Sequence, residues 1–514
     1  MESHHYMVKL CRALMNYGAP SHRLEEYMST TARSLGIQGQ FLYQPGCMVL
    51  AFDDPLGHTT AVKLVRTGGG LNFGKLEDTY KVYKDVFHGR MTAAQGDRRL
   101  TEIELRRNGI RRKYQVVMYG LASASVGPFG FQAGWNDLLW CFALGCIVGL
   151  LVVKGVPRSN RFANCFEFMA AAVTSFIARA VGSIDDGNIF CFSALAQSSI
   201  ALILPGYIFL RALVELQSGS IISGSARMVY AIMYSFFLGY GITMGTVLYG
   251  FIDRNAISET TCRYPIPWRW QPGFVVAFTC CLIVINKGRW KQAPVMVAVS
   301  LGGWAVTYFS TRAGLNNAQI SSTLGALTIG LLANGYSRVC DGFENRTLNW
   351  WDMQVRTRLH KVEVWCVLPL SSVSWRSFRL LITTRLHSYF DSSGPAASNL
   401  TEDYSLPRRR KDGYALAATA MLPAIFVQVP SGLAAGGSLV AGIITANGIT
   451  HPALVRTAMA AGVEQNTVIP LNLAAFSVGY TVVQVAIGIT VGLFLSSWFV
   501  YLFPGKKKSA LFSF

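Results

Sequence analysis

Apolar runs alternate with short charged segments along most of this chain, from about residue 114 onward. The runs are roughly 17–25 residues long, the length that an α-helix needs to cross a bilayer. We predict ten helical spans, and the ninth is expected to bend or re-enter around Pro430. The first five are 114–131, 135–153, 164–182, 189–213 and 226–251, and the second five are 272–286, 292–310, 318–336, 414–446 and 470–503.

The two groups of five spans share a pattern. Gly241-Ile242-Thr243-Met244-Gly245 lies in the fifth span and Gly488-Ile489-Thr490-Val491-Gly492 in the tenth. Upstream of each is a proline in an apolar run, in Leu204-Pro205-Gly206 and in Val429-Pro430-Ser431-Gly432. Interrupted spans at matching places in two halves are typical of secondary transporters, and an odd number of spans per half inverts the second half. The pattern predicts two inverted five-span repeats that move a small solute.

Residues 1–113 follow another pattern, which predicts a small cytosolic α/β domain. Pro20 can begin a helix, because its missing N–H costs nothing there, and Gly36 ends the helical periodicity that follows. Pro45-Gly46 indicates a turn between strands. Strands are expected at 41–43, 48–52 and 59–65, and helices at 75–91 and 99–109.

Composition supports a membrane protein and suggests its orientation. Of the 514 residues, 51% are hydrophobic and only 14% are charged, against roughly 25% charged in soluble domains. The net charge of +19 is spread over loops beside the apolar runs, so we expect no nucleic-acid partner. If the N-terminus is cytoplasmic, the basic segments that follow the second, fourth, sixth, eighth and tenth spans all face the cytoplasm, as the positive-inside rule requires. Both termini are then cytoplasmic, and Asp185, Asp186 and the 253–270 loop lie on the opposite side.

The eleven cysteines give no sign of a metal or redox site. The sequence has no C-x-x-C pair and no Cys/His cluster with metal spacing, so we expect no metal and no cofactor. We interpret the cysteines of the apolar runs, Cys191 among them, as small buried hydrophobic residues. Residues 1–13 have no long apolar core, so no cleavable signal peptide is expected.

The two proline positions are the predicted substrate sites. A proline inside a span frees a backbone carbonyl, which must find a partner or line a cavity that can bind an ion or a polar solute. An amino acid fits there, with its carboxylate at a half-helix N-terminus and its ammonium at freed carbonyls. The alternative for both Gly-x-x-x-Gly segments is a helix-packing face. The predicted substrate-binding residues are Pro205, Gly206, Thr243, Pro430, Gly432 and Thr490.

Charged side chains inside membrane spans are rare and are functional candidates by default. Glu167 lies near the cytoplasmic end of the third span, and we predict that it couples the solute to an ion such as a proton. Asp137 in the second span and Arg179 in the third are further candidates. All three lie near a predicted membrane boundary. The alternative to a functional role is therefore that these side chains extend to the lipid headgroups.

Two other segments raise alternatives. Ser21, His22 and acidic residues cluster at 18–26, which leaves a membrane-anchored hydrolase open, although an ordinary helix start explains them too and no nucleophile elbow is present. Residues 339–412 stand where the repeat needs only a short loop. We expect this segment to be poorly ordered, and three interpretations are open: a disordered cytosolic loop, a small added subdomain or a translated intron. The predicted division is 1–113, the cytosolic domain; 114–251, the first membrane half; 252–338 and 413–503, the second half; 339–412, the insertion; and 504–514, a basic tail.

The segment Leu14 to Glu25 resembles the opening of the threonine/serine exporter family, and the stretches around Pro205 and from Met421 to Gly432 resemble its two membrane halves. Its fungal branch comprises pheromone-regulated membrane proteins. The chain departs from the pattern at Ser431, which stands where the first half has glycine, and it starts without the long polar N-terminal extension of the fungal relatives.

This resemblance implies a cytosolic front domain, about ten spans and gradient-driven export of small polar amino acids such as threonine and serine. The implied partners are the amino acid, a coupling ion and the bilayer of the plasma membrane or vacuole, and a homo-oligomer stays open. The alternatives are the hydrolase and a non-transporting membrane scaffold in mating or cell fusion.

Overall fold

The computed structural model describes residues 2–54, 59–68, 70–106, 112–156, 160–253, 256, 261–313, 318–351, 417–428 and 471–502. The chain divides into two compact units, Met1–Gly335 with Leu416–Phe514, and Tyr336–Ala415. Pro430, Gly432 and the 504–514 tail lie outside the described residues, as does the predicted insertion beyond Trp351.

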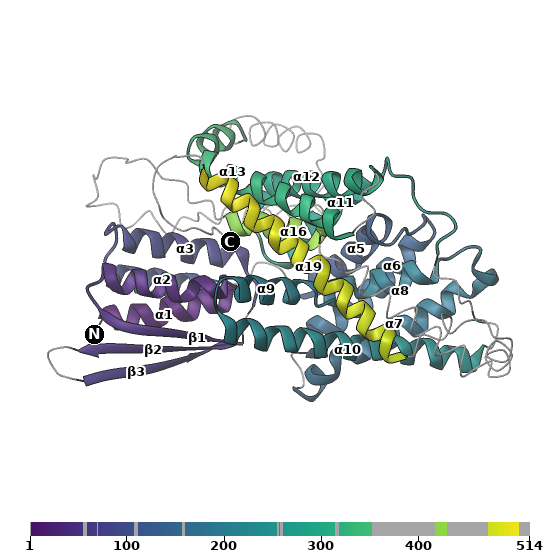
Figure 1. Ribbon diagram of the computed structural model, residues 1–514, viewed down its shortest axis with the longest axis horizontal. Coiled ribbons are helices and arrows are strands. Elements are labelled where there is room, and N and C mark those ends of the chain that lie inside the picture. Colours follow the sequence, from purple (N-terminus) through teal and green to yellow (C-terminus); the bar gives the residue numbers. More distant parts are fainter. Residues whose placement is uncertain are drawn as a thin grey trace, which may run out of the picture. The chain divides into compact units, whose positions relative to one another are not determined.

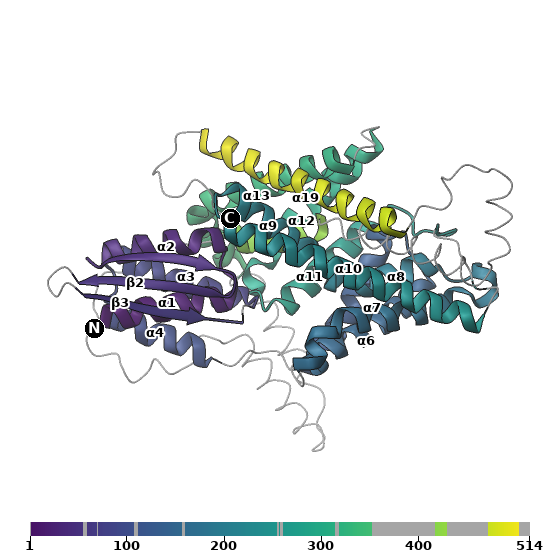
Figure 2. The ribbon, with the colours of Figure 1, turned by 60° about the horizontal axis from the view of Figure 1, so that its bottom comes forward.

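The N-terminal domain is a three-stranded antiparallel sheet with helices on one face (Figure 2). The strands are β1 (Gln38–Gln44), β2 (Cys47–Asp54) and β3 (Thr59–Arg66), and the helices are α1 (Glu2–Tyr17), α2 (Ser21–Ser34), α3 (Phe73–Phe87) and α4 (Ala93–Leu105). Gly46, at φ +80°, makes the turn between β1 and β2. Met48, Leu50 and Phe52 alternate onto the helix-covered face, where they join Tyr6 and Leu10 of α1 in the core. The predicted α/β domain is confirmed, and α1 is an addition to it.

Helices lie in all ten of the predicted spans. In the first half they are α5 (Arg112–Gly130), α6 (Asp137–Leu150) with the π-helical turn η1 (Leu151–Gly155), α7 (Asn160–Gly182), α8 (Phe192–Ile200), the 3₁₀ turn η4 (Ala201–Ile203), α9 (Gly206–Gln217) and α10 (Ile221–Ile252). In the second half they are α11 (Gln271–Ile285), η5 (Trp290–Gln292), α12 (Ala293–Arg312), α13 (Ala318–Trp351), α16 (Ala417–Gln428) and α19 (Leu471–Leu502). α13 therefore continues past residue 339, where the insertion was predicted to begin.

Length and apolar character identify some of these helices as candidate membrane spans. Within the described residues, five are long and apolar enough to cross a membrane, or six if the bent pair α8–α9 counts as one span. The five are Asp137–Gly155, Cys165–Gly182, Ile221–Ile252, Ala293–Arg312 and Val483–Val500. A count of ten spans stays a prediction.

The two groups of helices meet along α5, which packs on α11, and at α9. α7 packs along α10 and α5 along α6 in the first group, while α12 packs on α16 in the second (Figure 1). Leu210 of α9 lies in a core whose other members include Ile329 of α13, Ile425 of α16 and Ile489 of α19. The helix that follows Pro205 therefore packs both on α10 of its own group and on helices of the second group.

Candidate functional site

The fourth predicted span is broken at Pro205. α8 ends at Ile200, a single 3₁₀ turn follows, and α9 begins at Gly206 with its axis bent by 47°. Leu204 is extended, at φ −64° and ψ 139°, and Pro205 has no N–H with which to continue the helical ladder. Pro205 and Gly206 are both buried. The interrupted span that the sequence predicted is therefore present, and α9 begins inside the protein.

A tyrosine binds the backbone at this break. The Tyr234 hydroxyl of α10 donates to the carbonyl of Ile203 at 2.8 Å. Glu167 of α7 lies within electrostatic reach of Tyr234 and of Tyr230, one turn before it. Glu167, the predicted ion-coupling residue, thus lies in the neighbourhood of Tyr234, which sequence analysis did not single out.

The helix before the break is polar and fully enclosed. All nine residues of α8 are buried, among them Ser193, Gln197, Ser198 and Ser199. Gln197 Nε2 donates to Ser193 Oγ at 2.7 Å, and Ser123 of α5 donates to the Ser198 carbonyl at 2.8 Å. Buried polar groups at membrane depth are retained where they are paired or line a solute path. The run Gln197-Ser198-Ser199 in an apolar stretch was the signal for this helix, and the sequence analysis did not use it.

The other proline segment approaches the same place. α16 ends at Gln428, two residues before Pro430. The Phe426 ring stacks on Tyr207 with ring centroids 4.9 Å apart, and Val427 packs in one cluster with Ala201 and Leu202 of η4. The end of α16 and the break at Pro205 are therefore in contact.

A buried polar pair lies beside this contact. Gln428, only 8% exposed, donates from Nε2 to Thr307 Oγ1 of α12 at 2.7 Å. A Cβ atom added to Gly325 of α13 would lie 2.1 Å from Thr307 Oγ1 and 2.6 Å from Gln428 Nε2. Glycine at 325 is what allows α13 to close over the pair. Neither Gln428 nor Thr307 was predicted as a site residue. A single polar residue in an apolar run does not reveal a partner 121 residues away.

The two Gly-x-x-x-Gly segments form helix-packing seams. A Cβ at Gly245 would lie 2.3 Å from the Ala172 carbonyl of α7, and one at Gly492 would lie 2.3 Å from the Thr323 carbonyl of α13. Thr243 donates to the Gly239 carbonyl at 3.1 Å, and Thr490 to the Ala486 carbonyl at 2.7 Å, each within its own helix. The packing interpretation of these segments is therefore correct.

Asp137 and Arg179 do not reach toward headgroups. Each is 2% exposed, so the boundary interpretation is wrong for both. Asp137 accepts the Gly134 N–H at 2.8 Å and the Cys191 N–H at 2.9 Å, which ties α6 to the start of α8. Arg179 donates to the Thr246 carbonyl at 2.8 Å in the α7–α10 seam. Hydropathy places a charge along a helix but does not say which face it occupies.

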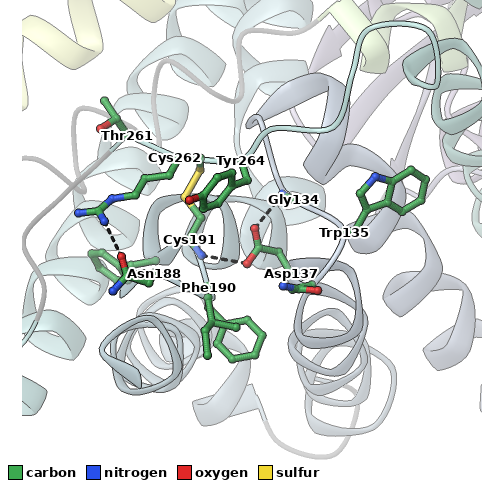
Figure 3. Close-up of a pocket in the computed structure, with 13 residues that line it drawn as sticks. Gly134, Trp135, Asp137, Asn188, Phe190, Cys191, Thr261, Cys262 and Tyr264 are labelled. Atoms are coloured by element: carbon green, nitrogen blue, oxygen red, sulfur yellow. Dashed lines mark hydrogen bonds between the residues drawn. A yellow bond between two sulfur atoms is a disulfide. The ribbon is translucent and has the colours of Figure 1, made fainter. Parts of the chain in front are cut away.

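A disulfide lies at the start of α8, beside Asp137 of α6. Cys191 is bonded to Cys262, with Cα atoms 5.3 Å apart, so the prediction of Cys191 as a plain hydrophobic residue is wrong (Figure 3). The two residues are 71 positions apart, and one sequence does not show such a pairing. Beside the bond is a cavity of about 240 Å³, lined by Asp137, Trp135 and Tyr264 among others.

We expect thiol counting to detect this bond. A maleimide-polymer label on denatured protein should add two more labels after reduction than before it. Cys262→Ser should remove that difference, because Cys191 is then already a thiol. Cys165→Ser, at an exposed free cysteine, is the matched control and should leave the difference in place. Equal labelling of the parent before and after reduction would contradict the bond.

Taken together, the apolar helices, the span broken at a proline and the N-terminal α/β domain define a membrane protein with several candidate spans. Comparison with known proteins finds a matching family model: residues 5–249 are similar to the threonine/serine exporter family. No solved structure matches this chain.

The full chain is similar to fungal proteins named pheromone-regulated membrane protein 10. It is 39% identical to the one from Debaryomyces hansenii over 99% of this chain and 43% of that protein. It is 40% identical to the one from Zygosaccharomyces rouxii, over 100% of this chain and 44% of that protein. The relative from Eremothecium gossypii is 38% identical, over 100% and 58%. The chain thus spans well under two thirds of the length of these relatives.

Proposed function

We propose that this protein is a secondary transporter that exports threonine, serine or similar small polar amino acids by alternating access between two inverted five-span halves. The observation that carries the proposal is the contact between the Pro205 break and the end of α16 before Pro430. It brings an interrupted helix of one half against the corresponding segment of the other, where transporters of this construction bind their solutes.

The chemistry of the break suits an amino acid. The N-terminus of α9 at Gly206 presents backbone N–H groups and the positive end of a helix dipole to a carboxylate. Freed carbonyls near Pro205 and Pro430, with Gly432 allowing close approach, would receive the ammonium group. Thr243 and Thr490 can only accept hydrogen bonds from the solute, because each hydroxyl proton is used within its own helix.

The glycine seams support two homologous halves. Cβ atoms at Gly241 and Gly245 would meet the carbonyls of Phe168 and Ala172, four residues apart on α7, at 2.6 and 2.3 Å. Those at Gly488 and Gly492 would meet the carbonyls of Gln319 and Thr323, four residues apart on α13, at 2.9 and 2.3 Å. In each half, the last predicted span thus packs on the third span of that half, α10 on α7 and α19 on α13, with the same register. A repeat requires such a match.

The disulfide supports the orientation that we propose. Disulfides persist in oxidising compartments and are rare in the cytosol. The Cys191–Cys262 bond therefore supports a non-cytosolic position for the loops around it, which are the loops that the charge pattern assigned to that side. Both termini are then cytoplasmic, in the plasma membrane or the vacuolar membrane.

The hydrolase alternative is weakened by the surroundings of Ser21. Its side chain is 2% exposed, and its hydroxyl donates to Glu215 of α9. A nucleophile must reach a substrate carbonyl and be activated by a base. A hydroxyl that is buried between two elements of the same chain does not meet the first condition.

Efflux of preloaded radiolabelled threonine and serine from expressing cells tests the proposal. Pro205→Ala is expected to lose efflux by restoring helix across the break, and Glu167→Gln by removing the titrating group. Tyr234→Phe should reduce the rate of efflux by a factor between a few-fold and about tenfold, since one hydrogen bond contributes about 0.5–1.5 kcal/mol. Tyr240→Phe, on an exposed ring of the same helix, is the matched control. Equal efflux from expressing and empty cells, with the protein in the membrane tested, would refute the amino-acid assignment and favour the scaffold.

A further inference from the structure

The N-terminal domain is attached to the first half through a buried ion pair. Glu215 of α9, only 1% exposed, pairs with Arg227 of α10, whose Nη2 lies 3.0 Å from Glu215 Oε1. Ser223 of α10 donates to the same carboxylate at 2.8 Å. The domain adds two hydroxyl contacts to this pair: Ser21 of α2 donates to Glu215, and Tyr43 of β1 accepts from Arg227 at 3.1 Å.

A second attachment joins the same domain to the second half. The backbone N–H groups of Phe73 and Gly74, where α3 begins, donate to the carbonyls of Asn286 and Lys287 after α11, each at 3.1 Å. Arg289 in the same turn pairs with Asp78 of α3 and lies 3.4 Å from Glu77. The turn that connects α11 to α12 is thus held against α3 by backbone bonds and by charge.

Both attachments can be released at modest cost. In the first, the two charges belong to the membrane half and stay paired on separation, while only neutral hydroxyls leave, and water can replace them. In the second, the side chains of Arg289 and Asp78 are 32% and 14% exposed. On separation Asp78 keeps a second partner, Arg106, whose Nη2 lies 2.9 Å from Asp78 Oδ2, and water can replace the bonds that Arg289 and the two backbone N–H groups lose. The contacts hold the domain in one register without fixing it permanently.

The first attachment bears on the helix that begins at the candidate site. α9 starts at Gly206 and carries Glu215 near its other end, so a helical segment of about 14 Å connects the Pro205 break to the domain. The second attachment bears on α11 and α12, and α12 carries Thr307 beside Gln428. The domain is therefore connected to both sides of the site.

We propose that the N-terminal domain is the cytoplasmic gate, a clamp across the two halves that must release one attachment before the site opens to the cytoplasm. This inference rests on the proposed function, because it assumes that the halves move apart. Ser21 and Asp78 are its positioning residues: neither touches the solute, and each sets where one half stands relative to the other.

A reversible lock tests the gate. In the double variant Asp78→Cys/Arg289→Cys, oxidation should form a disulfide between α3 and the α11–α12 turn. A protease site introduced at residues 107–111 makes this disulfide detectable. After cleavage, the two cross-linked fragments stay together on a non-reducing gel. The efflux rate of the cross-linked protein should fall at least tenfold, and reduction of the disulfide should restore it. Saturating internal threonine should slow the cross-linking, since it favours the opened clamp.

The matched control locks the domain internally. His5→Cys/Asp97→Cys replaces a hydrogen-bonded pair of side chains, with His5 Nδ1 2.9 Å from Asp97 Oδ1, between α1 and α4 of the same domain, and its oxidation should leave efflux unchanged. Each single-cysteine variant and the parent receive the same oxidant and reductant, which accounts for any effect on Cys191–Cys262. Among the native thiols, burial raises the pKa of Cys11 to about 12, so Cys11 stays protonated and does not compete.

The outcomes separate the two proposals. Efflux that persists in fully cross-linked Asp78→Cys/Arg289→Cys protein overturns the gate and leaves the exporter intact. Cross-linking whose rate is indifferent to threonine, in protein that exports it, also overturns the gate. Absence of efflux from the uncross-linked parent overturns the exporter, and the gate with it.

Discussion

Glu215→Ala is expected to lower the free energy of unfolding by about 3–5 kcal/mol, because it removes one partner of a buried ion pair and leaves the other charge uncompensated. Arg227 has a side chain only 17% exposed, and it would keep the Tyr43 hydroxyl as its remaining partner. Ser21 and Ser223 would lose their acceptor at the same time. The expected result is a strongly lowered melting temperature for the detergent-solubilised protein, measured by fluorescence-detected size exclusion after heating.

Two variants distinguish a lost charge from a lost side chain. Glu215→Met with Arg227→Leu should recover much of the stability, because apolar pairs of similar volume replace buried ion pairs at little cost. Glu102→Ala removes an exposed partner of Arg99, 2.7 Å away, and should change the free energy by less than about 1 kcal/mol. Equal melting of Glu215→Ala and Glu102→Ala would contradict the buried cluster.

The local signals in the sequence were sufficient for much of the fold. Pro45-Gly46 marked the turn between β1 and β2, and Pro205 marked the break, because proline and glycine act on the backbone of their own segment. α1 was missed although Met7, Leu10 and Leu14 have helical spacing, since no capping residue or proline marks where it starts. Its signal was periodicity alone.

The contacts that build the site could not be read in the same way. Ser21 meets Glu215 across 194 positions, and Gln428 meets Thr307 across 121. Such pairings are set by how helices pack, and a single sequence carries the residue types but not the partners. Positive charge beside the apolar runs was interpreted as an orientation signal, and the fold uses one such charge, Arg227, to hold Glu215. A charge near a membrane boundary can therefore serve both as an orientation signal and as an internal contact.

Gly245→Ala and Gly492→Ala are expected to lower the free energy of unfolding by about 1–3 kcal/mol each, because one added methyl group overpacks a closed seam. Each Cβ would lie 2.3 Å from a backbone carbonyl, that of Ala172 or of Thr323, and a backbone atom cannot rotate away as a side chain can. Thermal melting of the purified variants measures the effect. Gly273→Ala in α11 is the matched control, since its Cβ would meet nothing within 4 Å and alanine favours a helix. Equal melting of Gly245→Ala and Gly273→Ala would contradict the seam.

The double variant Gly245→Ala/Gly492→Ala extends this test to the motion of the halves. If each seam lies within one rigid half, the two losses should add to within about 0.5 kcal/mol, because distant sites without shared partners are independent. A loss much larger or smaller than the sum would mean that the seams communicate, and the halves could then not move as separate bodies. Additive losses would favour the Pro205 break and the contact between Tyr207 and Phe426 as the places where the halves move against each other.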